Sequence, residues 1–156
     1  MDEEKSLGGR LPRWHVTVAH TADVGIRATA PDPATLLEEA AAALAELSAD
    51  VRGAADVGAG VGWEPIQVRA DDLAGLTFAW LNELIGLADA RGEALVRAQV
   101  ERLDSGPDGW LARGRALFVA YDHLVRSRLQ VKAATFHRLA VTSERGGWAL
   151  EAYLDV

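Results

Sequence analysis

The alternation of apolar and polar residues predicts strands toward both ends of the chain. Residues 14–19 and 26–30 alternate with a period of two, which is typical of half-buried strands. The turn His20-Thr21-Ala22-Asp23-Val24-Gly25 separates them, so the two strands should form a hairpin. Further extended segments are predicted at about 61–70, 94–103, 110–118, 129–142 and 148–155.

Two segments between the strands have the helical period instead. The first helix is predicted from residue 33 to about 47, capped by Asp32, with the apolar face Leu36, Leu37, Ala40, Leu44 and Leu47. The second is predicted over about 72–90, with Asp71 as its N-cap and Gly92 as its terminator. Apolar residues surround most of this second helix, which predicts burial against more than one neighbour.

The order of elements predicts the fold class α+β, with two helices packed on a largely antiparallel or mixed sheet. Residues 1–12 are interpreted as a flexible tail and 13–156 as a single domain. In the last strand, alternation places Asp155 on the outer face. The hairpins at the two ends of the chain could pair in one sheet and bring Asp23 beside Asp155, which is a hypothesis at this stage.

Composition narrows the class of protein. With 156 residues, 49% of them apolar and 25% charged, the chain should fold as an ordinary globular domain. It contains no cysteine, which excludes a disulfide framework and fits a reducing cytoplasm. The net charge of −7 argues against strong direct nucleic-acid binding and favours a cation or a basic protein surface. No apolar run approaches the ~18 residues of a membrane span, so a cytoplasmic location is expected.

Few residues are candidates for chemistry. No serine lies in a G-x-S-x-G turn, and the four histidines lack the helical i, i+4 spacing of a zinc site. The glycine-rich segment 53–62 has no Gly-Lys-Ser/Thr and is interpreted as a connection. Asp23 and Asp155 could together hold a hard cation such as Ca²⁺ or Mg²⁺. The plainer alternatives are that Asp23 shapes its turn, that Asp155 is solvated, and that Lys132 is a surface lysine.

Four segments resemble the archease family. They are the His20–Gly25 turn, Trp80-Leu81-Asn82-Glu83-Leu84 in the second helix, Val131-Lys132-Ala133-Ala134-Thr135-Phe136-His137, and the terminal Leu154-Asp155-Val156. Each is short, but they occur in the family's order and span nearly the whole predicted domain. The resemblance implies the archease fold.

The resemblance also implies a function. Archeases assist the RNA ligase that joins a 2′,3′-cyclic-phosphate or 3′-phosphate end to a 5′-hydroxyl end in tRNA splicing and RNA repair. They promote guanylylation and turnover of the ligase and are not enzymes themselves, so no catalytic residue is expected. Carried over, the family's metal ligands are Asp23 and Asp155, with Val156 as a further ligand, and Lys132 is a functional residue. The expected cofactor is a divalent cation, Ca²⁺ first, with Mg²⁺ or Mn²⁺ as alternatives; Gln130 departs from the family's usual Glu.

The mechanism expected from these residues is delivery of a cation near the ligase's nucleotide pocket, where it would neutralise phosphate charge. Lys132 would contact a phosphate or a ligase carboxylate. Two alternatives stay open: a small metal-dependent phosphate-ester hydrolase, and a chaperone-like binding module with a structural ion.

Overall fold

The computed structural model describes residues 10–19, 23–52, 62–122 and 124–156. The predicted strands and helices are present, most with boundaries within about three residues of those expected. Parts of three predicted segments lie outside the described residues: residues 1–9 of the tail, 20–22 of the turn and 53–61 of the glycine-rich segment. In chain order the elements are β1 (Trp14–Ala19), β2 (Asp23–Ala30), α1 (Pro33–Ser48), β3 (Ala49–Asp50), β4 (Trp63–Ala70), α2 (Leu73–Arg91), β5 (Glu93–Gly106), β6 (Gly109–Ala120), β7 (Arg126–Ser127), β8 (Ala133–Glu144) and β9 (Gly147–Asp155).

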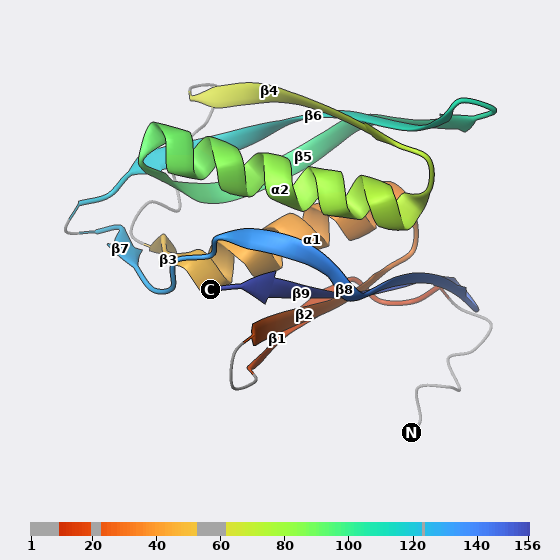
Figure 1. The fold of residues 1–156 in the computed structure, drawn as a ribbon, viewed down its shortest axis with the longest axis horizontal. Helices are drawn as coiled ribbons and strands as arrows, with labels where there is room; N and C mark the ends of the chain where they lie inside the picture. Colours follow the sequence, from red (N-terminus) through yellow and green to blue (C-terminus); the bar gives the residue numbers. More distant parts are fainter. Residues whose placement is uncertain (1–9, 20–22, 53–61, 123) are drawn as a thin grey trace.

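Both helices lie between two antiparallel sheets (Figure 1). One sheet has the strand order β1-β2-β9-β8 and the other β4-β6-β5, while β3 and β7 form a short separate pair. Helix α1 contacts β2 and β5, and α2 contacts β8 and β4, so each helix touches both sheets. The predicted α+β class is confirmed, with the strands divided between sheets rather than gathered in one. The apolar residues around α2 account for this, because burying them takes a partner on each side.

The helix ends follow from their capping residues. The side chain of Asp32 accepts a hydrogen bond from the N–H of Thr35 at 2.8 Å and begins α1. The N-cap of α2 is Asp72, which accepts from Gly75 N–H at 2.7 Å, so the prediction of Asp71 was wrong by one residue. Gly92 ends α2 as predicted, in the left-handed conformation with φ of 63°.

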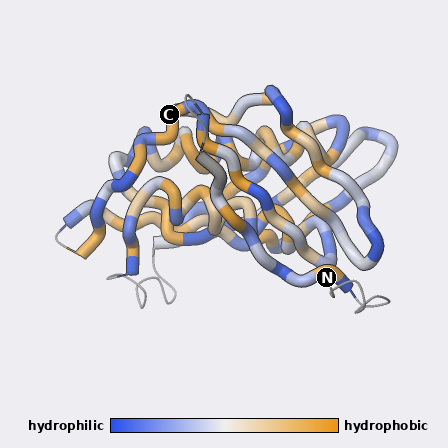
Figure 2. The backbone as a smooth tube through the Cα atoms, turned by 90° about the horizontal axis from the view of Figure 1, so that it is seen from below, coloured by the Kyte–Doolittle hydropathy of each residue, from blue (hydrophilic) through white to orange (hydrophobic). Residues whose placement is uncertain are grey.

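The core fills the space between helices and sheets. Trp80 is fully buried, and its indole N–H donates to the carbonyl oxygen of Leu37 at 2.9 Å, which ties α2 to α1. Hydrophobic and hydrophilic residues alternate along the strands (Figure 2), and the apolar ones face the helices. None of the helices within the described ranges is long and apolar enough to cross a membrane. Inward residues of β2 and β9 are Ile26, Ala28, Ala30, Leu150, Ala152 and Leu154.

Candidate metal centre

The two aspartates singled out in the sequence are direct neighbours across strands. In the antiparallel pair β2–β9, Asp23 is the register partner of Asp155, which confirms that the two terminal hairpins share a sheet. Both side chains lie on the face away from the helices, because Val24 and Leu154 alternate with them. Cβ atoms of such opposed residues are about 4.5–5.5 Å apart.

This arrangement favours a cation between the two carboxylates. Two like charges directly opposite each other destabilise a sheet, and a shared cation removes that cost. Asp23 is half-buried and Asp155 is exposed at the end of its strand. Across the described residues, no group of three or more His, Cys, Asp and Glu side chains gathers in a metal-binding arrangement. A hard ion would therefore take its remaining ligands from backbone carbonyls and water, as Ca²⁺ and Mg²⁺ commonly do.

Lys132 lies against the same strand end. Its backbone N–H donates to the carbonyl oxygen of Asp155 at 2.8 Å, and the next residue, Ala133, is the register partner of Asp155 on the β8 side. The Lys132 residue is exposed and lines a cavity of about 250 Å³ together with Asn82 and Gln130. The lysine and the acidic pair are thus brought to one end of the four-stranded sheet.

Asn82 holds this strand end to helix α2. Its side-chain oxygen accepts from the N–H of Ala134 at 2.9 Å, and its side-chain nitrogen donates to the carbonyl of Ala134 at 3.2 Å and to that of Phe78 at 3.1 Å. The sequence identified Asn82 as part of a motif but assigned it no role. A polar amide directly after the apolar pair Trp80 and Leu81 of the helix was the available signal.

Gly25 and Tyr153 form the surface next to the acidic pair. They are register partners, and a Cβ atom added at Gly25 would lie 2.8 Å from Cε1 of the Tyr153 ring. The ring therefore covers the glycine, and Tyr153 is only 3% exposed although it lies on the outer face. The guanidinium of Arg138 lies over the same ring, 4.6 Å from its centroid. This explains why the turn motif ends in glycine.

A small charged network extends from Tyr153 along the sheet. The Tyr153 hydroxyl donates to Glu151 at 2.7 Å, and Arg27 lies 3.5 Å from the same carboxylate. The hydrogen bond from Tyr153, supported by the charges of Arg27 and Arg138, lowers the pKa of the Glu151 carboxyl. The same hydrogen bond, together with burial and the Glu151 charge, raises the pKa of the Tyr153 phenol, although the two arginines act against this rise. Glu151 therefore stays ionised, four residues along the strand from Asp155.

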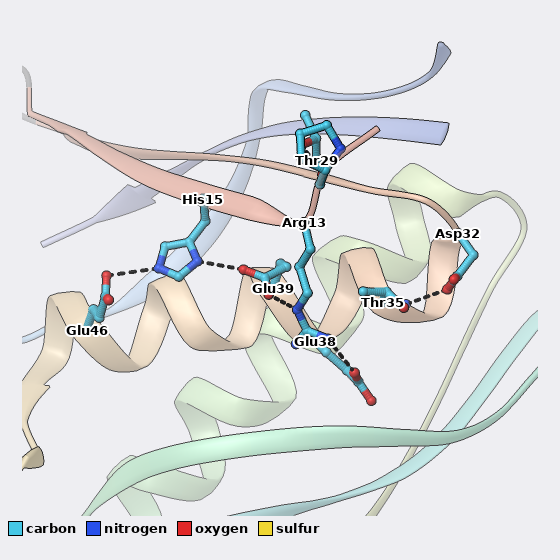
Figure 3. A network of polar contacts seen from close by, with 9 residues as sticks. Arg13, His15, Thr29, Asp32, Thr35, Glu38, Glu39 and Glu46 are labelled. Atoms are coloured by element: carbon cyan, nitrogen blue, oxygen red, sulfur yellow. Dashed lines mark hydrogen bonds and ion pairs between the residues drawn. The ribbon is translucent and has the colours of Figure 1, made fainter. Parts of the chain in front are cut away.

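The other residues considered for chemistry, Val156 and the four histidines, do not all lie beside the acidic pair. Val156 follows Asp155 directly and is 39% exposed, so its carbonyl is at the same strand end. His20 and His123 lie outside the described residues, and His137 is exposed on β8. His15 is structural: it bridges Glu39 at 2.7 Å and Glu46 at 2.9 Å on α1, as Figure 3 shows.

The fold and site define a small α+β protein with an acidic pair and a lysine at one end of a sheet. Comparison with known proteins then gives its family. The model of the Archease protein family (MTH1598/TM1083) matches residues 16–156, so the chain belongs to the archease family.

Individual relatives agree with this. Protein archease of Methanopyrus kandleri is 32% identical over 144 residues, covering 89% of this chain and 96% of the relative. Protein archease of Thermococcus gammatolerans is 26% identical over 155 residues, covering 94% of this chain and all (100%) of the relative. The solution structure of Methanobacterium thermoautotrophicum protein 1598 superposes with a TM-score of 0.74 at 25% identity, covering 91% of this chain and 98% of that one.

Proposed function

We propose that this protein activates the RNA ligase that joins a 2′,3′-cyclic-phosphate or 3′-phosphate RNA end to a 5′-hydroxyl end. Membership of the archease family supports a role as activator of a tRNA ligase in RNA processing. The observation that carries the cation-dependent part of the proposal is the direct opposition of Asp23 and Asp155 in neighbouring strands. In this role the protein promotes guanylylation and turnover of the ligase and is not itself an enzyme. The absence of cysteine fits work in the reducing cytoplasm.

The carboxylates of Asp23 and Asp155 would hold a divalent cation, Ca²⁺ first among the candidates, with the carbonyl oxygen or the terminal carboxylate of Val156 as a further ligand. When bound, the cation would supply charge neutralisation for the nucleotide phosphates in the ligase. Lys132, held beside the pair by its backbone hydrogen bond to Asp155, would bind a phosphate or a carboxylate of the ligase. Asn82 holds the backbone of Ala134, which is two residues after Lys132 in the sequence, in place.

The test is a multiple-turnover guanylylation and ligation assay with the cognate ligase. We expect Asp23→Asn and Asp155→Asn each to lower stimulation at least about tenfold, because one of two charged ligands is lost. Asp108→Asn, in the turn between β5 and β6, removes the same charge far from the site and should keep full stimulation. Full stimulation by both site variants would refute the cation role, and failure of the wild type to stimulate the ligase would refute the function itself.

A direct binding measurement identifies the ion. Calorimetric titration of the wild type with Ca²⁺, Mg²⁺ and Mn²⁺ should give saturable binding that Asp23→Asn and Asp155→Asn weaken and Asp108→Asn preserves. Equal binding by the wild type and all three variants would mean that the ion binds at another site.

A further inference from the structure

The three-stranded sheet β4-β6-β5 carries arginines on its outer face. Ile66, Val68, Ala112 and Ala116 are buried toward the helices, so the residues that alternate with them face outward. Figure 1 shows both helices on one side of this sheet and no described helix or strand on the other. The outward positions include Arg69, Arg97, Arg102, Arg113 and Arg115, which we call the arginine face.

Register places these arginines in rows across the three strands. Arg113 is the partner of Gln67 on one side and of Arg102 on the other. Arg115 lies one row away, and Arg69 lies opposite Leu111 in the next row on the other side. Two arginines directly opposite each other destabilise a sheet unless an anion lies between or beside them. The opposed pair Arg102 and Arg113 thus resembles the acidic pair Asp23 and Asp155, with positive charges in place of negative ones.

Acidic partners neutralise only part of this charge. Arg102 lies 2.8 Å from Asp104, and Arg115 lies 3.7 Å from Glu101. Within the described ranges, no carboxylate lies within 4.0 Å of a basic nitrogen of Arg69, Arg97 or Arg113. The face is therefore positive in a chain whose net charge is −7.

Contacts within the protein also hold Arg97, Arg102, Arg113 and Arg115 in place before any ligand arrives. Trp63 lies on the same face, and the guanidinium carbons of Arg115 and Arg97 lie 4.2 and 5.6 Å from the centroid of its ring. Nε of Arg113 donates to the side-chain oxygen of Gln67 at 2.9 Å, which leaves its terminal N–H groups available. Pre-organised guanidinium groups lose less entropy on binding an anion.

We propose that the arginine face binds the phosphate backbone of single-stranded RNA. A positive surface built on a sheet, with an aromatic residue among arginines, is how proteins commonly hold single strands without reading their sequence. Arginine forks match phosphate oxygens, and arginines two residues apart on a strand are about 6.6 Å apart, so one strand of RNA can contact several. The choice of RNA over an acidic protein rests partly on the proposed function in RNA processing.

This binding was not expected from the charge total. A net charge of −7 predicts weak binding to any polyanion when the charge is spread evenly. The fold instead separates the charges, with Asp23 and Asp155 on the outer face of one sheet and the arginine face on the outer side of the other. An RNA strand that meets the basic side approaches a locally positive surface.

The test uses this protein alone, so its outcome is separate from that of the ligase assay. Fluorescence anisotropy would follow binding of a labelled oligouridylate of about 12 nucleotides at salt concentrations from about 50 to 200 mM. We expect micromolar affinity at low salt, with the logarithm of affinity falling against the logarithm of salt with a slope of about −2 for three phosphate contacts. Arg69→Gln combined with Arg113→Gln should weaken binding about tenfold and make the slope shallower, lowering its magnitude by about 1.4.

The matched control is Arg126→Gln combined with Arg145→Gln, which removes the same charge from other parts of the surface. This variant should bind RNA as the wild type does. Circular dichroism melting curves check that both variants fold. No saturable binding by the wild type at low salt, or equal weakening in both variants, would overturn the proposal. Competition by polyglutamate as effective as that by unlabelled RNA would overturn it too, in favour of an acidic protein partner.

Discussion

At the scale of single residues, the contact between Gly25 and Tyr153 gives a stability prediction. A Cβ atom at position 25 would lie 2.8 Å from a ring carbon of a nearly buried tyrosine, so the ring must move. We expect Gly25→Ala to lower the free energy of unfolding by about 1–3 kcal/mol, measured by urea denaturation. Gly86→Ala is the control, because nothing lies within 4 Å of its added Cβ and the helix should gain about 0.5–1 kcal/mol. Equal stability of Gly25→Ala and the wild type would contradict the predicted clash.

At this scale the sequence indicated which residues belong to the candidate site better than it indicated which residues surround them. Asp23 and Asp155 were identified from a turn motif and a strand pattern, and their hypothesised proximity is confirmed by the register. Tyr153 lies on the outer face that alternation predicts for Asp155, but its burial depends on Gly25 across the sheet and on Arg138. Contacts between residues far apart in the sequence leave no trace in periodicity. The metal assignment stays a prediction.

At the scale of elements, Asn82 joins helix α2 to strand β8 and is expected to position Lys132. Asn82→Ala would leave the N–H and C=O of Ala134 without their side-chain partner, which should cost about 1–3 kcal/mol of stability. It should also speed hydrogen exchange of the Ala134 amide and lower ligase stimulation. Glu83→Ala, the next residue on the same helix, is the control and should change neither exchange nor stimulation. Unaltered exchange at Ala134 in Asn82→Ala would show that the amide bridge is dispensable.

The sequence predicted the helices and strands well, but it predicted less well which strands lie in the same sheet. The limits of both helices followed from capping residues and from the apolar stripe, which are local signals. The division of strands between two sheets was not predicted, since an alternating strand shows which of its faces is buried but not which strand lies beside it. The breadth of apolar residues on α2 was the one indication of a second sheet.

At the scale of the whole molecule, the attachment of the four-stranded sheet to helix α1 should depend on pH. Burial lowers the pKa of His15, but its hydrogen bonds and charge interactions with Glu39 and Glu46 outweigh this and raise the pKa above its ordinary value of 6.5. Burial raises the pKa of Glu39, but His15 and Arg13 bring it below 4.5. Figure 3 shows these side chains between β1 and α1.

The signs of these shifts fix the pH range of maximum stabilisation. A raised histidine pKa contributes stability that is complete below 6.5 and is lost as pH rises through the folded-state value. A lowered Glu39 pKa contributes stability present above 4.5 and lost as pH falls through the folded-state value. The cluster should therefore stabilise the fold most between about pH 4.5 and 6.5. Urea unfolding of the wild type and of His15→Gln tests this: the difference between them should be larger near about pH 5.5 than near about pH 8. The same difference at both pH values would mean that His15 is not charged in the folded protein and that neutral hydrogen bonds alone join β1 to α1.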